Sequence, residues 1–410
     1  MEELITLNIQ SLVYEGYGLS RLPDGRAAFV PFVLPGETIQ ARILEEKKGH
    51  ALGELVKIVD PHPQRIAPRC AHFGVCGGCH YQHIPYSLQL EYKRGVFVEQ
   101  LQRIAGIEAP VINKIFLSVQ EWGYRNTLQF NLSDSGNMCF ADFYHNQLFE
   151  VRECHLPMPE VGALWPQLEF EPETHLERVE VRQSNNGDLM LVLRGSEKDL
   201  PEMETEAPCS IVHLSGADQV VLAGNDHLVM RVLEKDFKVS GGTFFQTNLA
   251  ATEALVGEVR EIVKQSGCRS IMDVFCGVGL FSAFLAEDAD QIIGIESSIA
   301  ACDDFAVNLD IYDNVSLYQG KVEQVIPFIK ENTDCVIIDP PRSGLKREAA
   351  MGLIEKSPRL IIYVSCNPST LARDAKHLAE AGYQLESSTL VDMFPQTFHI
   401  ESVNIFTKKK

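Results

Sequence analysis

A strand, a glycine-rich turn and a helix follow one another in the segment SIMDVFCGVGLFSAFLA, from Ser270 to Ala286, and this succession constrains the fold most. Gly277 and Gly279 let a ligand approach the backbone at the carboxyl end of the strand. A second strand, QIIGIE, ends in Glu296, whose carboxylate can accept hydrogen bonds from two ribose hydroxyls. The dinucleotide fingerprint requires a third glycine, but this chain has Ser282 there. Without a pyrophosphate to bind, that glycine is dispensable, so the pattern favours S-adenosylmethionine.

Two later strands place reactive side chains at the same edge of the predicted sheet. The segment DCVIIDPPRSGL is a strand that ends in Asp339, and Arg342 follows its two prolines. The segment IIYVSCNPSTLARD begins as a buried strand, and Asn367 opens a helix directly after Cys366. Ligands of open α/β sheets bind at the carboxyl ends of the strands. Enzymes that methylate amino groups usually have an aromatic residue after such a Pro-Pro pair, so Arg342 argues against an exocyclic nitrogen as the target.

Cys366 and Glu401 suit a reaction at carbon 5 of uracil. Carbon 5 becomes nucleophilic only after another group adds to carbon 6, and a thiolate is the side chain best suited to that addition. Cys366 fits this role, although most isolated cysteines are inert core residues. The proton left on carbon 5 must then be removed by a base. Glu401, in FHIESV, fits the second role, and the neighbouring His399 is expected to be structural.

Three cysteines lie close together in CAHFGVCGGCHYQH, at Cys70, Cys76 and Cys79. The glycines between them permit the tight turn that brings thiolates to one centre. A fourth ligand is required, for which Cys154, in VRECHLP, is the best candidate and Cys139 the second. Spacing alone leaves zinc and an iron–sulfur cluster equally open, because four thiolates also suit zinc.

Short alternating runs punctuated by glycine and proline, from Leu4 to about Asp60, predict a small antiparallel barrel of about five strands. This segment resembles the TRAM domain of RNA-modifying enzymes, and barrels of this size often bind oligonucleotides. The stretch from Pro85 to Gly106 predicts a helix. In Trp122-Gly-Tyr124-Arg125-Asn126, an aromatic residue beside an arginine is suited to stack on a base and bind a phosphate; an ordinary strand start is the alternative.

The successive motifs FFQTN, DVFCGVG, GIE, DPPR, SCNP and FPQTFHIE resemble those of the RNA (uracil-5-)-methyltransferase family over essentially the whole chain. The resemblance implies a nucleophile at Cys366, a base at Glu401 and a 4Fe–4S cluster in place of zinc. It also implies cofactor contacts from four residues: Gln246, Phe275, Glu296 and Asp339. One departure is Leu280, where several members have a polar residue that contacts the cofactor.

The predicted fold is α/β, with a Rossmann-like methyltransferase domain, an N-terminal OB-like barrel and a central α+β iron–sulfur domain. At 410 residues the chain suits two or three domains. We expect a TRAM domain at 1–61, an iron–sulfur domain at 62–84 and 113–242, and a catalytic domain at 85–112 and 243–410. The family implies this discontinuity, in which the helix at 85–112 packs with the catalytic domain.

The expected partner is RNA, and ribosomal RNA is favoured over transfer RNA because a barrel together with a cluster resembles that branch. The net charge of −20 opposes binding through phosphates, unless basic residues gather locally. Candidates for such patches are Lys93, Arg94 and Arg103, and the lysines at 408–410. The alternatives are a transfer RNA uracil-5 methyltransferase, an RNA cytosine-5 methyltransferase and a non-catalytic iron–sulfur RNA-binding protein.

We expect a monomer in the cytoplasm. The acidic start Met1-Glu2-Glu3 has no apolar segment after it, which argues against a signal peptide. The longest apolar run, Ile271 to Ala286, contains Asp273 and two glycines, so no membrane span is expected.

Overall fold

The computed structural model describes residues 4–172, 175–195, 208–216 and 218–409. Two compact units make up the chain, and each combines segments that are distant in sequence. Unit 1 comprises Met1–Gln100, Cys139–His155 and Phe394–His399, and unit 2 comprises Leu101–Met138, Leu156–Met393 and Ile400–Lys410. The division into three domains predicted from the sequence stays a prediction.

Unit 1 begins with a six-stranded sheet in the order β1-β5-β6-β4-β3-β2. Alternate apolar residues of these strands, among them Leu7, Val30 and Ile39, form a buried core, as the period of two in the sequence predicts. Strands β1 and β2 are the two ends of this order of hydrogen-bonded neighbours. Closure of the sheet into an OB-like barrel stays a prediction. The elements are β1 (Leu4–Asn8), β2 (Ser11–Leu12), η1 (Tyr14–Gly16), β3 (Tyr17–Arg21), β4 (Ala27–Pro31), β5 (Thr38–Glu46) and β6 (His50–Asp60).

The helix predicted from Pro85 to Gly106 is confirmed. It consists of α1 (Tyr86–Gln100) in unit 1, which continues as a π-helical turn, η2 (Leu101–Ala105), in unit 2. Helix α1 is bonded to the segment 394–399 of unit 1, because the Lys93 ammonium donates to the Phe394 carbonyl oxygen at 2.9 Å. Two short strands, β9 (Met138–Ala141) and β10 (Leu148–Glu150), pair in antiparallel fashion.

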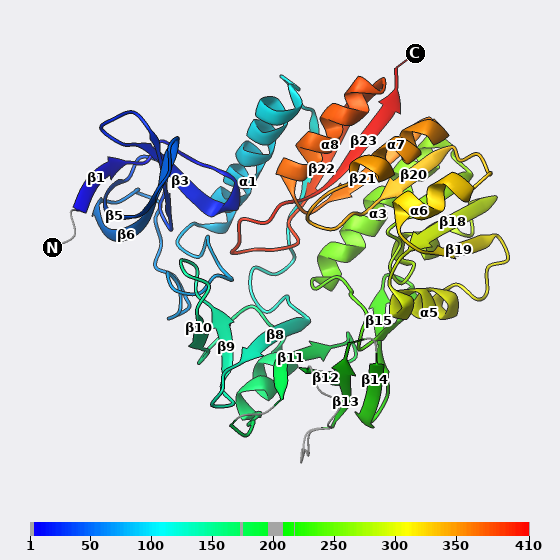
Figure 1. The fold of residues 1–410 in the computed structure, drawn as a ribbon, viewed down its shortest axis with the longest axis horizontal. Helices are drawn as coiled ribbons and strands as arrows, with labels where there is room; N and C mark the ends of the chain where they lie inside the picture. Colours follow the sequence, from blue (N-terminus) through cyan, green and yellow to red (C-terminus); the bar gives the residue numbers. More distant parts are fainter. Residues whose placement is uncertain (1–3, 173–174, 196–207, 217, 410) are drawn as a thin grey trace. The chain divides into compact units, whose positions relative to one another are not determined.

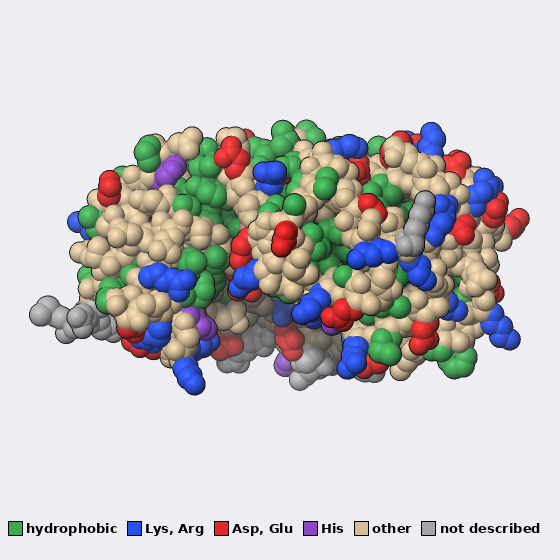
Figure 2. All heavy atoms as spheres, turned by 90° about the horizontal axis from the view of Figure 1, so that it is seen from above, with side chains coloured by type: hydrophobic (Ala, Val, Ile, Leu, Met, Phe, Trp, Pro, Cys, Tyr) green, Lys and Arg blue, Asp and Glu red, His purple; other side chains and the backbone are tan. Residues whose placement is uncertain are grey.

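The expected basic patches are only partly available. Lys93 is buried, at 4% exposure, and so cannot offer its charge to a phosphate. Lys410 lies outside the described residues. Figure 2 shows basic and acidic side chains interspersed over the face that it presents. Among the described residues, no helix combines the length and the hydropathy needed to cross a membrane.

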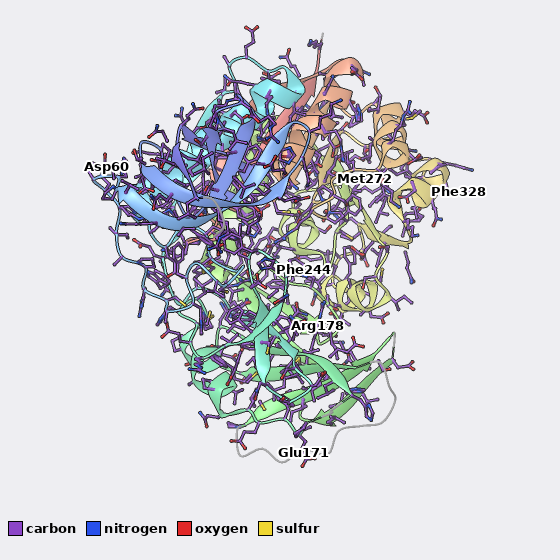
Figure 3. The ribbon with its side chains drawn as sticks, turned by 60° about the vertical axis from the view of Figure 1, so that its left-hand side comes forward. Asp60, Glu171, Arg178, Phe244, Met272 and Phe328 are labelled. Carbon is purple, nitrogen blue, oxygen red and sulfur yellow. The ribbon has the colours of Figure 1, made fainter. Side chains whose placement is uncertain are left out.

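Unit 2 contains the predicted Rossmann-like sheet, with eight strands in the order β19-β18-β17-β20-β21-β23-β22-β7. The first five are parallel, whereas β23 is antiparallel to both of its neighbours. The central strands are buried, as Met272 in the middle of β17 illustrates (Figure 3). The strands are β7 (Ile112–Phe116), β17 (Ser270–Val274), β18 (Gln291–Glu296), β19 (Val315–Gln319), β20 (Cys335–Ile338), β21 (Leu360–Ser365), β22 (Tyr383–Val391) and β23 (Glu401–Lys408).

Helices alternate with the parallel strands and lie beside this sheet (Figure 1). The first, α3, begins where the Asn248 side chain accepts a hydrogen bond from the Ala251 amide, and it ends at Gly267 in the left-handed conformation. The helices are α3 (Leu249–Ser266), α4 (Leu280–Leu285), α5 (Ile299–Asn308), α6 (Val322–Val325), η4 (Ile326–Phe328), α7 (Arg347–Lys356) and α8 (Pro368–Glu380).

A second sheet of unit 2 has the order β8-β11-β12-β13-β14, and a separate hairpin joins β15 to β16. Strand β11 is buried along most of its length, where it pairs with β8 and β12. The elements are β8 (Thr127–Leu132), α2 (Pro159–Leu164), η3 (Trp165–Gln167), β11 (Leu176–Gln183), β12 (Leu189–Gly195), β13 (Cys209–Ser215), β14 (Asp218–Ala223), β15 (His227–Val232) and β16 (Lys235–Ser240).

Candidate active site

The register of β21 and β23 brings Cys366 and Glu401 together. These strands are antiparallel, and their last pair is Ser365 with Ser402. Cys366 directly follows Ser365, and Glu401 directly precedes Ser402, so the two residues lie opposite each other at the sheet edge. Asn367 directly after Cys366 caps α8, because its side chain accepts from two amides in the first turn of that helix, which fixes the backbone that follows the thiol.

Asp339 reaches the same edge from the neighbouring strand. It follows β20, which is parallel to β21, and its amide donates to the Val274 carbonyl oxygen at 3.2 Å. Desolvation by burial, with the negative charge of Asp273, raises the pKa of Asp339 to about 7. Three of the predicted site residues, Cys366, Glu401 and Asp339, therefore lie together and influence one another's ionisation.

Burial and negative charge make this edge a poor place to form anions. Desolvation, followed by the charges of Glu401 and Asp339, raises the pKa of Cys366 to about 12. Glu401 is 4% exposed, and its desolvation and the charge of Asp339 raise its pKa well above the ordinary value. The Arg342 guanidinium acts in the opposite direction and lowers the pKa of both Cys366 and Glu401.

Hydrogen bonds hold the Arg342 loop against the start of α8. The Arg342 carbonyl oxygen accepts from Asn367 Nδ2 at 3.1 Å and from Thr370 Oγ1 at 3.3 Å. The sequence singled out Arg342 only as an argument against amino methylation. Its influence on both ionisable groups emerges only once the fold brings the loop to them.

The turn after β17 forms a backbone cradle. Phe275 has a φ of +65° and Gly277 a φ of +54°, and the first is an unusual conformation for a residue with a side chain. A Cβ built on Gly277 would meet nothing within 4 Å. One oxygen of Glu296 accepts from the Gly277 amide at 3.1 Å, and the other accepts from the Ser297 and Ser298 amides at 2.6 and 2.7 Å. These residues fit a ribosyl ligand, because the glycine leaves its backbone accessible and the acid is fixed beside it.

Ser282 has a structural role at the position where the dinucleotide fingerprint requires glycine. Its amide and its hydroxyl both donate to one oxygen of Asp273, at 3.1 and 2.6 Å. Desolvation raises the pKa of the fully buried Asp273 to about 6, and the Ser282 bonds oppose this shift. An acid inside an otherwise apolar strand is the sequence signal for this pair.

Gln246 lies in the segment that leads into α3. Its carbonyl oxygen accepts from Asn126 Nδ2 at 3.0 Å, and the carbonyl oxygen of Thr247 accepts from the Asn126 amide at 2.9 Å. These bonds fix the backbone around Gln246. A cofactor contact from its side chain stays a prediction. Leu280, the departure from the family motif, is buried.

The four predicted cluster ligands all lie in unit 1 and interact. Negative charge on Cys154 raises the pKa of Cys70, Cys76 and Cys79, after the larger effect of burial. Cys154 thus influences the three clustered thiols, and its role as the fourth ligand ahead of Cys139 stays a prediction. Among the described residues, no three His, Cys, Asp or Glu side chains form a group that could hold a single metal ion.

The spacing of these four cysteines leaves zinc and an iron–sulfur cluster open. Four thiolates around one zinc lie within roughly 4 Å of one another, because each is about 2.3 Å from the metal. The ligand thiolates of a cubane cluster lie further apart. Cys79 is buried and the other three thiols are half-buried, and the described residues contain no single-ion group, so the choice between zinc and the cluster stays a prediction.

Comparisons with known proteins agree on a class. The family model described as tRNA (Uracil-5-)-methyltransferase matches residues 218–410. An uncharacterized RNA methyltransferase of Aquifex aeolicus is 32% identical over 423 residues, which cover 99% of each chain. Another from Halalkalibacterium halodurans is 30% identical and covers 99% of this chain and 97% of its own length.

One solved structure is similar over nearly the whole chain. It is the crystal structure of a Pyrococcus abyssi tRNA (uracil-54, C5)-methyltransferase in complex with S-adenosyl-L-homocysteine. The TM-score is 0.75 at 25% sequence identity, and the match covers 98% of this chain and 100% of that one.

Proposed function

The chain belongs to the RNA (uracil-5-)-methyltransferase family and is an S-adenosylmethionine-dependent enzyme, and we propose that it methylates carbon 5 of a specific uridine through a covalent bond between Cys366 and the base. The observation that carries this proposal is the pairing of β21 with β23, which sets Cys366 opposite Glu401. A thiol and a carboxyl group at one place supply the two functions that the reaction needs.

Cys366 starts the reaction. Its Sγ gives its proton to solvent and forms a bond to carbon 6, and the electrons of the carbon 5–carbon 6 double bond move onto the carbonyl at carbon 4. Carbon 5 is then nucleophilic, and Arg342 stabilises the negative charge that develops, since it lowers the pKa of both neighbouring acids. S-adenosylmethionine supplies an electrophilic methyl group.

Glu401 completes the reaction. Its carboxylate takes the proton from carbon 5, the double bond re-forms, and the electrons of the carbon–sulfur bond return to Cys366. The raised pKa of Glu401 makes its carboxylate a stronger base than an exposed one, which suits a weakly acidic carbon–hydrogen bond.

The proposed cofactor contacts are those that the family resemblance implies, and the cradle geometry supports them for Glu296 and Phe275. Glu296 would accept hydrogen bonds from the ribose hydroxyls, and the backbone at Phe275 and Gly277 would lie against the nucleoside. Gln246 and Asp339 would hold the methionyl part. The expected role of Asp339 agrees with its position between the cradle after β17 and the thiol after β21.

We propose a 4Fe–4S cluster on Cys70, Cys76, Cys79 and Cys154 in unit 1. When bound, it supplies a rigid cross-link between chain segments that carries no catalytic step. Cys70, Cys76 and Cys79 lie on one segment, whereas Cys154 lies on another, so ligation would fasten 139–155 to the remainder of the unit.

Ribosomal RNA is our first candidate substrate, because a barrel together with a cluster resembles that branch of the family. Transfer RNA is the second, because the similar solved structure is that of a tRNA (uracil-54, C5)-methyltransferase. Labelled S-adenosylmethionine and total RNA from cells that lack the enzyme discriminate them, with nucleoside mass spectrometry of each purified RNA. We expect 5-methyluridine in ribosomal RNA. Label in 5-methylcytidine, or in no nucleoside, would overturn the proposal.

A further inference from the structure

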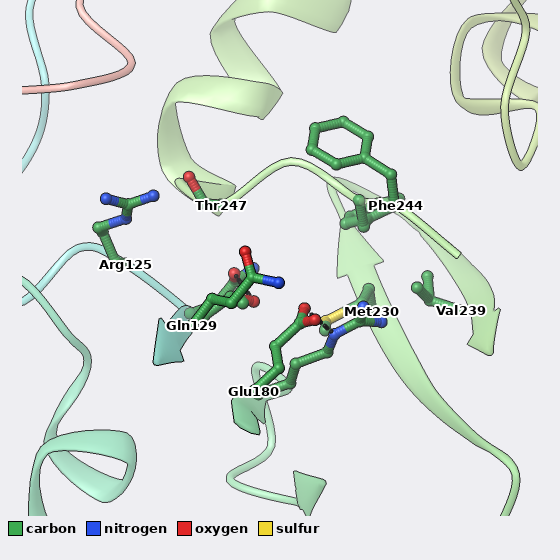
Figure 4. A pocket seen from close by; sticks show the side chains of 11 residues that line it. Arg125, Gln129, Glu180, Met230, Val239, Phe244 and Thr247 are labelled. Atoms are coloured by element: carbon green, nitrogen blue, oxygen red, sulfur yellow. Dashed lines mark hydrogen bonds and ion pairs between the residues drawn. The ribbon is translucent and has the colours of Figure 1, made fainter. Parts of the chain in front are cut away.

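Unit 2 contains a cavity of about 210 Å³ that is separate from the residues assigned above. It lies between β8, β11 and the segment that precedes α3, and Cys366, Glu401, Asp339, Glu296 and Gln246 are not among its lining residues. Figure 4 shows Arg125 and Phe244 on opposite sides of this pocket, with Thr247 above and Gln129 and Glu180 below.

Two polar atoms that line the cavity have no partner among the described residues. Arg125 Nε and Thr247 Oγ1 are both buried, yet neither makes a hydrogen bond. A buried unpaired polar atom is costly and occurs where a ligand or a function explains it. Both atoms belong to one cavity, so one ligand could satisfy both.

Charge in the cavity favours an electron-rich ligand. The negative charge of Glu180 is compensated, since its carboxylate accepts a hydrogen bond from Arg182 Nε at 2.6 Å. Arg182 also donates to the carbonyl oxygens of Ser240 and Thr243 at 3.1 and 3.0 Å. Arg125 forms no ion pair with a carboxylate in the described part of the chain, so its positive charge stays available to a ligand.

Phe244 supplies a flat apolar surface at the rim of the cavity. Its side chain is 73% exposed, whereas Met230 and Val239 form a buried apolar floor. An aromatic ring with this exposure buries little apolar area inside the unit and suits stacking against a base. At about 210 Å³, the cavity is smaller than the roughly 300–1,000 Å³ of drug-sized sites, so it accepts about one planar ring system.

We propose that this cavity binds one nucleobase of the RNA substrate next to the target uridine, stacked on Phe244 and hydrogen-bonded by Arg125 and Thr247. The location beside the target rests on the proposed cofactor contact of Gln246, because Asn126, which lines the cavity, is hydrogen-bonded to the carbonyl oxygens of Gln246 and Thr247. The proposal rests on the methylation of RNA and does not depend on Cys366 or on which RNA is modified. It also explains the motif at 122–126: Tyr124 is buried and cannot stack on RNA, whereas Arg125 lines the cavity.

The first test measures binding alone. A short, fluorescein-labelled single-stranded RNA is titrated with the full chain and with Phe244→Ala, Thr247→Val and Arg125→Met variants. Loss of base stacking is expected to weaken binding by about 5-fold or more in Phe244→Ala, and loss of one hydrogen bond by about 2- to 10-fold in Thr247→Val.

Arg178→Met is the matched control for Arg125→Met. Arg178 is exposed on β11 of the same sheet (Figure 3) and does not line the cavity, so its loss removes the same charge elsewhere. Affinity for S-adenosylhomocysteine is expected to be unchanged in all four variants, which separates the cavity from the cofactor cradle. If Arg125→Met weakens RNA binding no more than Arg178→Met, and Thr247→Val binds normally, the proposal is wrong.

A second test identifies the nucleotide. Abasic sites are placed one at a time on either side of the target uridine, and their effects on binding are compared between the unmodified chain and Phe244→Ala. At one flanking position, the loss of affinity caused by the abasic site and the loss caused by Phe244→Ala should not add, because both changes remove the same stacking contact. Full additivity at every flanking position would overturn the proposal. Failure of methyl transfer would affect the proposed mechanism and leave these binding measurements interpretable.

Discussion

Glu401 begins β23 directly across from the end of β21, where Cys366 follows. These residues are 35 positions apart in the sequence (401 − 366), and only the antiparallel pairing brings them together. Each is buried enough for its charged form to be disfavoured. Each group therefore holds a proton more tightly than an exposed one does, and three of the predictions below concern this edge of the sheet.

Glu401→Gln is expected to trap the reaction midway. The amide cannot take the proton from carbon 5, so addition of Cys366 and methyl transfer proceed but release does not. A covalent protein–RNA complex should accumulate on a denaturing gel, with product formation reduced at least about 100-fold. Glu386→Gln, at an exposed position of the neighbouring β22, is the matched control and should turn over normally. Normal turnover by Glu401→Gln would place the base elsewhere.

Arg342→Gln is expected to shift the pH dependence of kcat/KM upward. The guanidinium lowers the pKa of the Cys366 thiol, so its removal raises that pKa further. A smaller fraction of thiolate then exists at any given pH, and the rise in rate with pH moves to higher pH. Arg342→Lys keeps the charge and should recover part of the shift. An equal loss of activity at every pH would mean that Arg342 acts only by positioning.

Ser282→Ala is expected to destabilise unit 2 by about 1–3 kcal/mol, because the hydroxyl bond to the buried Asp273 is lost. The pKa of folded Asp273 is already raised to about 6, and the variant should raise it further. A raised acid pKa contributes stability at low pH that is lost as pH rises, so the deficit should be larger near about pH 8 than near about pH 5. Denaturant unfolding at both pH values measures this, with the exposed Ser316→Ala as control. An equal loss of unfolding free energy at the two pH values would contradict the link between the pKa of Asp273 and stability.

Cys154→Ser is expected to remove the iron–sulfur cluster, whereas Cys139→Ser should retain it. Protein purified without oxygen should be brown and contain iron and sulfide. Cys154 is chosen because negative charge on it raises the pKa of Cys70, Cys76 and Cys79. Metal analysis that finds one zinc and no iron in the unmodified chain would refute the cluster.

Local sequence signals predicted the parts of the site that depend on a strand and the turn after it. Glu296, Asp339 and Cys366 each follow an apolar run, so the parallel order of the sheet placed them at one edge. Lys93 could not be predicted in this way, because its burial depends on a carbonyl oxygen about 300 residues away. Ser282 differs, because its partner Asp273 is nine residues away and the acid inside an apolar strand is a local signal; their bond explains the missing glycine better than the absence of a pyrophosphate does.

The cavity beside Phe244 was also beyond the sequence. Its walls come from β8, β11, β15 and the segment before α3, and such distant segments share no local pattern. The motif at 122–126 did indicate RNA contact, but it could not show that Tyr124 faces inward while Arg125 faces the cavity. Side-chain direction at a strand start depends on register, which the partner strand determines.

The most direct test of the central claim uses RNA that contains 5-fluorouridine at the target position. Fluorine cannot leave carbon 5 as a proton does, so the unmodified enzyme with S-adenosylmethionine should form a stable adduct that migrates as a single heavier band on a denaturing gel. Cys366→Ala should bind this RNA with similar affinity and form no adduct. An adduct of undiminished yield in Cys366→Ala would show that the nucleophile is another residue, and the account of this site would be wrong.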